Sequence, residues 1–598
     1  MLKTHNCGEL RPEHIGQEVV LAGWVNFQRD QGGVIFIDLR DRWGMTQVVV
    51  SVDQNPEALK VAKEARAEYV LQVSGLVRAR PDGTENKDLA TGKIEVEAKS
   101  IVLLNAAKTP PFYINRDEKI DETERMRYRY LDLRRPRMQN NIVLRHRIVK
   151  FIRDYLDNQG FVEVETPILF KTTPEGARDF LVPSRLMPGS FYALPQSPQQ
   201  LKQLLMVAGY ERYFQVARCF RDEDLRGDRQ PEFTQLDLEM SFVNREDVMS
   251  LIEGMMTELS IGVAERTPVY MPFPRIKYED AMEKYGSDKP DIRYDLSAVE
   301  VDDIAGQSGF SVFVSNVADG KPVKAIRVPK LGLESGTALR KITADLETLA
   351  RGAGAKGLAW MAIPADETGE VKGPIGKFFT VEQKVALFER MGVEAGDLLL
   401  FVSDKREIVY EVVDTLRRSL AKQLNLIDPD VVAFCWIVDF PQFYWSEEEQ
   451  RWDPSQHLFS SPLPEDIPLL DTDPGKARGS QYDLVCNGYE VAGGSIRIHD
   501  RALQEKIFPL IGLSMEEAMD QFGHMLDAFE YGVPPHGGIA SGIDRLVMVL
   551  AGEPNIREVI AFPKTQKGSD LMAHCPSEPS ERQLSELFIR VELPKEEA

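Results

Sequence analysis

Two strand-like segments, residues 212–223 and 232–242, constrain the fold of this chain most strongly. They flank the charged loop 224–231, and side chains alternate along a strand, so Arg221 and Glu223 share one face of the first segment. One face of the second segment carries Phe233, Gln235, Asp237 and Glu239. Because an exposed hairpin needs no such charges in register, we expect an antiparallel sheet with a binding site on this face.

The residue types on this face are typical of a nucleotide site. Arg221 can make a forked contact with a phosphate, Glu223 can accept hydrogen bonds from an amino group, and Phe233 offers a flat surface to a base. The segment has neither a Walker loop nor a G-x-G-x-x-G turn. A nucleotide would therefore be held by side chains of the sheet.

The first 106 residues are predicted to form a five-stranded OB-fold β-barrel. Three strands, a helix and two strands is the element order of this fold, which commonly binds single-stranded nucleic acid or oligosaccharide. The helix is expected over residues 57–68. The strands are expected over residues 19–26, 34–39, 47–52, 69–77 and 93–104.

Six arginines follow the barrel, and only Asp132 interrupts them with a negative charge. They could form a solvated face between domains or a stripe that contacts phosphates, and the pattern leaves both open. Further on, the apolar face of residues 144–157 predicts a helix that ends at Gly160, followed by a strand over 161–166. The six residues are Arg125, Arg127, Arg129, Arg134, Arg135 and Arg137.

Residues 286–420 differ in character from the segments on either side, with strands, helices and Gly-rich turns of their own. Strands are expected over 312–314, 324–328 and 398–402. Because the charged segments resume only afterwards, we expect an inserted α+β domain. The whole chain is therefore predicted to be multidomain α/β (α+β).

Composition limits the class of protein. The longest apolar run in the 598 residues, 431–438, is far below the ~18 residues that span a bilayer, so we expect no membrane contact and a cytoplasmic location. Five dispersed cysteines without a C-x-x-C pair argue against a disulfide framework and a zinc site. A net charge of −22 argues against non-specific attraction to nucleic acid, so any such contact must be local.

Three motifs resemble those of the class II aminoacyl-tRNA synthetases. Residues 542–545 are similar to motif 3, and residues 160–167 to motif 1, which implies a homodimer. The barrel implies the subgroup that charges aspartate, asparagine or lysine, and residues 173–179, 195–199 and the insertion are similar to the bacterial aspartyl enzymes. The residues that resemble motif 2 are Arg221, Glu223, Arg229, Phe233 and Asp237.

This resemblance implies six segments. They are the anticodon-binding barrel 1–106, a hinge 107–135, catalytic parts 136–285 and 421–560, the insertion 286–420 and a C-terminal extension 561–598.

Physical reasoning selects aspartate within the subgroup. A lysine pocket needs an anionic floor and an asparagine pocket must exclude a carboxylate, whereas Lys202 and Arg497 attract one. Alone, Arg497 could equally be a surface residue, but residues 487–497 are similar to a family signature. The aspartate contacts that the resemblance implies are Glu175, Gln199, Lys202, Arg221, Asp237, His457 and Arg497.

The implied reaction joins aspartate to ATP as aspartyl-adenylate and then transfers it to the terminal ribose of tRNA. Displacement at phosphorus needs positioning and charge neutralisation, not a protein nucleophile. The catalytic residues implied are Arg221, Glu223 and Arg545. The ATP contacts implied are Arg221, Asp222, Glu223, Arg229, Gln230, Phe233, Glu490, Gly542, Ile543, Asp544 and Arg545.

Asp483 and Glu490 resemble the carboxylates that hold Mg²⁺ between phosphates, although a bare pair of acids is more often surface charge. Two departures from the family pattern stand near the substrate. Bacterial members usually show two adjacent histidines where this chain has Gln456 and His457, and Ala492 replaces a common glycine. The role of the missing histidine is therefore open.

The resemblance implies an anticodon site on the barrel. Without it, Phe36 would more often belong to the barrel core. The tRNAs for aspartate and asparagine differ at the third anticodon base, and Gln31 and Gly83 offer no group that rejects U, so we expect both tRNA(Asp) and tRNA(Asn) to be charged. The residues implied are Arg29, Gln31, Phe36, Gln47, Gly83 and Glu95.

Two other functions are conceivable for this core, an ATP-dependent amide-forming synthetase and an inactive binding protein. The barrel and the arginine-rich connector argue against the first. The complete set of Arg221, Glu490 and Arg545 argues against the second.

Overall fold

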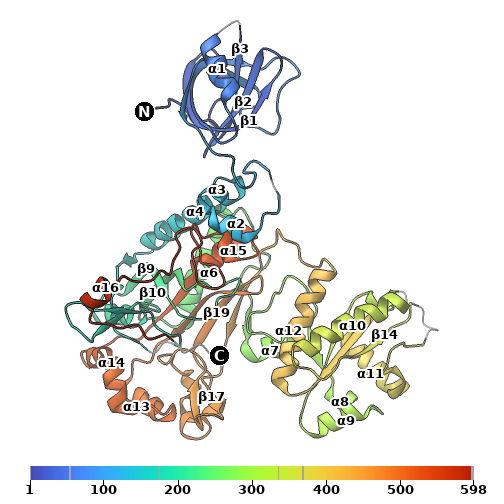
Figure 1. The fold of residues 1–598 in the computed structure, drawn as a ribbon. Coiled ribbons are helices and arrows are strands. Elements are labelled where there is room, and N and C mark those ends of the chain that lie inside the picture. Colours follow the sequence, from blue (N-terminus) through green and yellow to red (C-terminus); the bar gives the residue numbers. More distant parts are fainter. Residues whose placement is uncertain are drawn as a thin grey trace. The chain divides into compact units, whose positions relative to one another are not determined.

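The computed structural model describes residues 2–52, 55–116, 118–173, 176–334, 336–365 and 370–593. The chain, whose helices and strands are labelled in Figure 1, divides into two compact units. The first comprises Met1–Val143 and Ile560–Ser577, and the second comprises Leu144–Val559 and Glu578–Ala598. The six segments expected from the sequence stay predictions.

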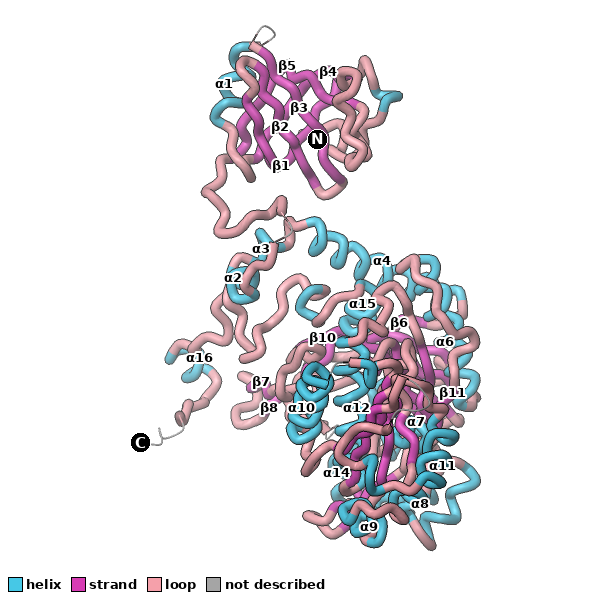
Figure 2. Tube along the Cα trace, turned by 90° about the vertical axis from the view of Figure 1, so that its right-hand side faces the viewer, coloured by secondary structure: helices cyan, strands magenta, loops and turns pink. Residues whose placement is uncertain are grey.

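The predicted OB barrel is confirmed in the first unit, as Figure 2 shows. Its five strands close in the order β1-β2-β3-β5-β4. Between β3 and β4 lies helix α1 (Pro56–Glu64), which is shorter than expected and is capped by the Asn55 side chain. The strands are β1 (Glu18–Asp30), β2 (Val34–Asp41), β3 (Gly44–Ser51), β4 (Val70–Ala79) and β5 (Ile94–Asn105).

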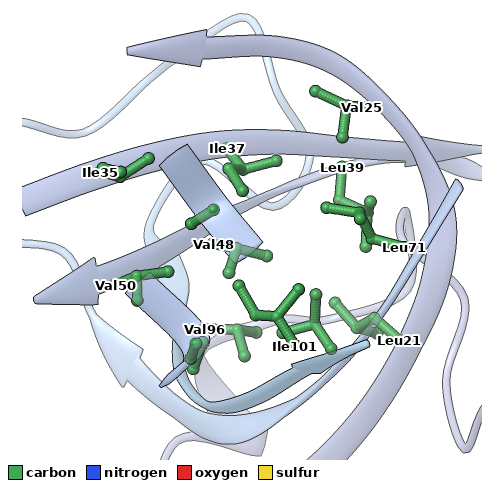
Figure 3. Close-up of a cluster of buried hydrophobic side chains, with 14 of the residues drawn as sticks. Leu21, Val25, Ile35, Ile37, Leu39, Val48, Val50, Leu71, Val96 and Ile101 are labelled. Atoms are coloured by element: carbon green, nitrogen blue, oxygen red, sulfur yellow. The ribbon is translucent and has the colours of Figure 1, made fainter. Parts of the chain in front are cut away.

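Alternation along the strands builds the barrel core. On β2, Ile35, Ile37 and Leu39 point inward and are fully buried (Figure 3). Phe36 is only partly buried and is not part of this hydrophobic cluster. The core alternative for Phe36 is therefore excluded.

The arginine-rich connector carries helices α2 (Glu122–Arg127) and α3 (Arg129–Asp132). Asp132 is fully buried and accepts hydrogen bonds from Arg125 at 3.0 Å and from Arg129 at 2.7 Å, with Arg135 at 3.5 Å. Arg129 also donates to the carbonyls of Ile560 and Ala561, at 2.7 and 2.9 Å. These three arginines stabilise the fold of the first unit, because one buried carboxylate binds all of them. For these residues, a solvated face between domains and a stripe that contacts phosphates are therefore both wrong.

The second unit is built on an eight-stranded sheet of order β11-β16-β19-β20-β21-β10-β9-β6. The pairs β11–β16 and β9–β6 are parallel and the central strands antiparallel, which confirms the expected antiparallel core. The strands are β6 (Val162–Glu163), β9 (Arg212–Phe220), β10 (Glu232–Ser241), β11 (Arg275–Lys277), β16 (Phe434–Val438), β19 (Gln481–Cys486), β20 (Tyr489–Ile496) and β21 (His536–Gly542).

Three helices pack on these central strands. Helix α5 (Gln199–Val207) lies against β9 and β10, α6 (Arg245–Gly262) against β19 and β21, and α15 (Ile543–Ala551) against β10, β20 and β21. The helix expected over 144–157 lies within α4 (Pro136–Asn158). The strand expected over 161–166 is only the two-residue edge strand β6.

The inserted region has a four-stranded antiparallel sheet of order β12-β13-β15-β14 with a hydrophobic cluster on each face. The strand expected over 312–314 is wrong. This segment is part of helix α9 (Ser311–Ala318), because Phe310, Phe313 and Val317 pack into one cluster at helical spacing. The elements are β12 (Ala298–Glu300), β13 (Val323–Val328), β14 (Ala359–Ala362), β15 (Leu398–Ser403), α8 (Asp302–Ala305), α10 (Gly336–Gly352), α11 (Val381–Met391) and α12 (Arg406–Gln423).

Eight further helices and strands of the described residues lie before, between or after the strands of the central sheet along the chain. None of the helices in the described ranges is long and apolar enough to cross a bilayer. These elements are β7 (Leu181–Pro183), β8 (Phe191–Ala193), α7 (Tyr278–Tyr285), β17 (Phe443–Ser446), β18 (Arg451–Pro454), α13 (Arg501–Leu510), α14 (Met515–Phe529) and α16 (Glu581–Glu586).

Replacing the buried carboxylate of the connector should destabilise the first unit. In Asp132→Asn, three arginines would lose their shared anion, so we expect the free energy of unfolding to fall by ~3–5 kcal/mol. Denaturant titration followed by circular dichroism measures this change. Glu124→Gln is the control, because Glu124 and Arg127 are exposed and 3.7 Å apart, and it should change stability by less than ~0.5 kcal/mol. Equal stability of Asp132→Asn and the control would contradict this account.

Candidate active site and barrel face

A cavity of about 470 Å³ opens on the central sheet of the second unit. Of the residues predicted to contact aspartate, ATP or Mg²⁺, Asp222 and Ile543 do not line it, and Glu175 lies outside the described residues. The predicted residues that line it are Gln199, Lys202, Arg221, Glu223, Arg229, Gln230, Phe233, Asp237, His457, Asp483, Glu490, Arg497, Gly542, Asp544 and Arg545.

A buried ion network forms one end of the cavity. Lys202 Nζ lies 3.0 Å from Asp237 Oδ1 and 3.3 Å from Glu239 Oε2. The Arg497 guanidinium donates to both Glu239 oxygens, at 2.9 and 3.2 Å, and to Ser495 Oγ at 2.7 Å. All four charged residues of this network are almost fully buried. Two cations are therefore held side by side and pre-oriented.

Glu239 was not predicted as a site residue, yet it is the centre of this network. Burial by itself would raise the pKa of Glu239, but Arg497 and then Lys202 outweigh burial and lower it to about 2. The carboxylate is therefore ionised at neutral pH. Glu239 lies two residues after Asp237 on β10, so the two carboxylates share one face of the strand. This shared face, together with the two cations that Glu239 contacts, was the signal that could have assigned Glu239 to the site.

Glycines make room for this network. Gly538 on β21 pairs with Glu239, and a Cβ there would lie 2.0 Å from Glu239 Oε2 and 2.2 Å from the Leu238 carbonyl oxygen. On the next strand, a Cβ at Gly494 would lie 2.3 Å from the Gly538 carbonyl oxygen. The sheet can enclose Glu239 only because these two positions lack side chains.

Several polar atoms on the cavity wall have no hydrogen-bond partner within the described part of the chain. They include Gln199 Nε2 and His457 Nδ1, which are buried beside the ion network. Burial and then the charges of Arg497, Lys202 and Arg221 lower the pKa of His457 to about 3. A neutral imidazole and a free amide are therefore available to a polar ligand.

The β9–β10 loop carries the second group of cavity residues. Strand β9 ends at Phe220 and not at residue 223, because the Asp222 N–H donates to the Arg178 carbonyl and leaves the ladder. The Arg221 guanidinium lies 5.2 Å from the Phe233 ring centroid, and Glu223 accepts from Arg229 at 3.1 Å. An aromatic face, a cation and a carboxylate thus lie together as a nucleotide requires.

Helix α15 brings Arg545 to the same part of the cavity. Arg545 donates to the Glu490 carbonyl at 2.6 Å and to Asp228 Oδ2 at 3.1 Å. Asp544 accepts from the Thr234 N–H at 2.8 Å and from Arg145. Asp544 therefore ties the start of α15 to β10, which positions Arg545.

Asp483 and Glu490 converge over a glycine. A Cβ at Gly493 would lie 3.0 Å from Asp483 Oδ1 and 3.5 Å from Glu490 Oε1. Burial and then the charge of Glu490 raise the pKa of Asp483 well above its usual range. Among the described residues, no group of three or more His, Cys, Asp and Glu side chains could hold a metal alone. The pair could hold Mg²⁺ if phosphate oxygens and water supplied the remaining ligands, because Mg²⁺ prefers oxygen ligands.

The first unit has its own polar surface, the outer barrel face, which we define as Arg29, Phe36, Gln47 and Glu95. The structure brings these four predicted residues together. Arg29 Nη2 donates to Gln47 Oε1 at 3.2 Å, Gln47 Nε2 donates to Glu95 Oε2 at 2.8 Å, and the Arg29 guanidinium lies 5.9 Å from the Phe36 ring centroid. Phe36 is partly exposed and offers a ring for stacking. Gln47 and Glu95 are buried, at 7% and 1% exposed, and Glu95 is also paired with Arg78 at 2.8 Å, so Arg29 and Phe36 are the more accessible residues of this face.

Gln31 and Gly83 lie in exposed turns. Gly83 has φ +80°, and the Thr84 N–H donates to the Pro81 carbonyl across the turn at 3.0 Å. A Cβ at Gly83 would have no described atom within 4 Å. The turn therefore needs glycine for its backbone conformation, and it leaves open space where a side chain could stand.

Comparison with known proteins agrees with this geometry. Residues 121–566 match the family model of the tRNA synthetases class II (D, K and N), and residues 19–104 match the OB-fold nucleic acid binding domain. Among curated relatives, an aspartate–tRNA(Asp/Asn) ligase of Dehalococcoides mccartyi is 53% identical over the full length of both chains. One of Rubrobacter xylanophilus is 54% identical over 100% of this chain and 98% of that protein. An aspartate–tRNA ligase of Geobacillus kaustophilus is 53% identical over both full lengths.

Solved structures share the fold. Asparaginyl-tRNA synthetase from Pyrococcus horikoshii, complexed with asparaginyl-adenylate, has a TM-score of 0.59 at 20% identity and covers 94% of this chain and 99% of its own. The aspartyl tRNA synthetase from Entamoeba histolytica has a TM-score of 0.57 at 19% identity, with 94% and 91% covered. With family model, full-length relatives and cavity in agreement, the chain belongs to the class II tRNA synthetases of the D, K and N group.

Proposed function

We propose that this protein is an aspartate–tRNA ligase that forms aspartyl-adenylate from L-aspartate and ATP and transfers the aspartyl group to tRNA(Asp) and tRNA(Asn). The observation that carries the proposal is the pair of buried cations, Lys202 and Arg497, held by Glu239 at the end of a nucleotide-sized cavity. The names of the full-length relatives support it and do not favour an amide-forming synthetase.

The ion network selects the amino acid. The side-chain carboxylate of aspartate would lie against Lys202 and Arg497, and its α-ammonium group against Asp237 and Gln199. A lysine side chain would bring a third cation to this end, and an asparagine amide would bring no charge to it. Lys202 and Arg497 share Glu239. Because Asp237 would meet the α-ammonium group, the side-chain carboxylate of aspartate balances the second cation, so aspartate is the best match.

ATP would occupy the other part of the cavity. Arg221 would neutralise the α-phosphate as the carboxylate of aspartate attacks, Phe233 and Arg545 would enclose adenine, and Glu223 would accept from its amino group. Arg229 and Arg545 would contact the γ-phosphate of ATP. Asp483 and Glu490 would hold Mg²⁺, which when bound neutralises phosphate charge and orders the phosphate chain.

The outer barrel face would bind the anticodon by stacking on Phe36 and hydrogen bonding to Arg29, Gln47 and Glu95. Discrimination between tRNA(Asp) and tRNA(Asn) would be weak, because the open turn at Gly83 has no side chain that rejects U. Two of the relatives described above are named for both tRNAs. The cytoplasmic location stays a prediction from the sequence.

A homodimer through the motif 1 region is part of the proposal. After edge strand β6, Ile168 and Leu169 are 48% and 52% exposed. Phe170 pairs with Ala193 of β8, so this segment is joined to the β7–β8 hairpin, in which Leu181 and Phe191 are also exposed. An exposed apolar surface of this kind on a sheet edge fits a second copy of the chain.

Removing one cation should abolish aspartate recognition. In Lys202→Ala, the substrate carboxylate loses a buried partner worth ~3–5 kcal/mol. The kcat/KM for aspartate in ATP–pyrophosphate exchange should therefore fall by roughly two to four decades. The KM for ATP should change by less than about threefold. Lys150→Ala, at an exposed lysine of α4, is the control. An unchanged aspartate dependence would remove Lys202 from the pocket.

The barrel and the cavity should be separable. Phe36→Ala should weaken tRNA charging by ~1–3 kcal/mol, the value of one lost stack, and leave exchange without tRNA intact. Trp43→Ala is the control, because Trp43 is an exposed aromatic residue of the same barrel. Loss of exchange as well would contradict the assignment of Phe36 to the anticodon.

Charging should tolerate U at the third anticodon position. Aspartylation of purified tRNA(Asn), and of tRNA(Asp) transcript with C changed to U at that position, should have kcat/KM within about tenfold of unaltered tRNA(Asp). The open turn at Gly83 is the physical reason. Charging about a hundredfold less efficient would show a strict enzyme in which another group fills that space.

A further inference from the structure

One buried carboxylate joins the barrel to the connector. Glu68, just before β4, is 4% exposed. It accepts hydrogen bonds from Arg40 of β2 at 2.7 Å and from Arg134 of the connector at 2.9 Å. The Arg134 guanidinium also lies 5.2 Å from the ring centroid of Trp24 on β1. Arg134 is therefore held by charge, by hydrogen bonding and by an aromatic face.

A second tie lies beside the first. The Asn115 side chain donates to the Asn26 carbonyl at 2.8 Å, and Arg40 donates to the Asn26 side chain at 3.1 Å. Asn26 sits at a bulge of β1, where the pairing with β2 shifts between Val25 and Phe27. A bulge leaves a backbone carbonyl without its ladder partner, so the connector can use it.

The backbone at Glu68 is unusual. Its φ is +69°, a left-handed conformation that residues other than glycine seldom adopt, and its N–H donates to the Val25 carbonyl at 2.8 Å. Such a conformation persists only where the surroundings over-determine it, and it tends to occur where geometry serves function.

The connector is fixed on its other side as well. Asp132, two residues before Arg134, gathers Arg129 and two further arginines, and Arg129 donates to the carbonyls of Ile560 and Ala561. Barrel, connector and residues 560–577 accordingly fall in one compact unit. Glu68 and Arg134 belong neither to the outer barrel face nor to the residues that line the cavity.

We propose that Glu68 and Arg134 are positioning residues that fix the orientation of the barrel on its connector, so that a tRNA held by its anticodon presents its 3′ end to the adenylate. The inference rests on the proposed function. A structured tRNA transmits a rotation at its anticodon end as a displacement of its 3′ end, and about 1 Å of misplacement can cost about a hundredfold in rate. Loss of the pair should therefore lower the charging of full-length tRNA without lowering adenylate formation or anticodon binding.

Three measurements test the pair with Arg134→Gln, Glu68→Gln and the milder Arg134→Lys, which keeps the charge and loses the planar fork. They are ATP–pyrophosphate exchange without tRNA, the Kd for an isolated anticodon stem-loop, and kcat/KM for full-length tRNA(Asp). We expect the first two to stay within about twofold and the third to fall at least about tenfold in the Gln variants. Glu18→Gln, at an exposed ion pair of the same barrel, is the control and should change none of them.

In the double variant the loss of charging should be smaller than the product of the two single losses, because both substitutions break the contact between Glu68 and Arg134. Charging within twofold of the unaltered protein would overturn the inference. Parallel loss of stem-loop affinity would overturn it too, because the pair would then maintain the barrel fold. If the unaltered protein neither binds the stem-loop nor charges tRNA, the proposed function itself fails.

Discussion

The bidentate contact between Arg497 and the buried carboxylate of Glu239 is the interaction on which the cavity depends. Two cations would not lie side by side in a closed sheet without an anion between them, because an unpaired buried charge is costly. Glu239 meets both, and its own pKa is lowered to about 2 as a result. The cationic end of the cavity therefore exists before any ligand arrives.

The surrounding backbone follows from this arrangement. Gly538 and Gly494 have no side chains because the Glu239 carboxylate and a neighbouring carbonyl occupy their Cβ positions. His457 stays neutral because it is buried beside Arg497 and Lys202. At the nucleotide end of the cavity a cation is likewise held in place before a ligand binds, since Arg545 donates to a backbone carbonyl and to Asp228. The reaction needs oriented charge and not a nucleophile, and the structure supplies oriented charge.

Much of the fold could be predicted from alternation and element order. The barrel strands and the β9–β10 hairpin lie at their expected positions, with ends that differ by up to four residues, because their apolar positions keep one period. Helix α4 contains the expected helix but begins eight residues earlier. Helix α9 was missed because two valines and a phenylalanine at 312–314 suggested a strand, while Phe310, Phe313 and Val317 carry the helical spacing. The cluster around Asp132 was missed because a carboxylate among arginines looks the same in sequence whether it is buried or exposed.

The candidate site was predictable as a set of residues but not as a network. Fifteen of the residues that the motif resemblance implies line one cavity. Glu239 belongs to none of these motifs, and only its register opposite Gly538 shows that it is enclosed. Phe36 was ambiguous for a related reason, since an aromatic residue on a barrel strand can face either way. The register of β2 decides it, with Ile35 and Ile37 inside.

A crystal structure with L-aspartate bound tests the central claim most directly. The account predicts the side-chain carboxylate of aspartate within hydrogen-bond distance of both Lys202 Nζ and the Arg497 guanidinium, with the Arg497–Glu239 contact retained and the α-ammonium group beside Asp237. Aspartate bound with its α-carboxylate on those two cations, or bound elsewhere in the cavity while the Lys202, Glu239 and Arg497 contacts stay as they are, would contradict it.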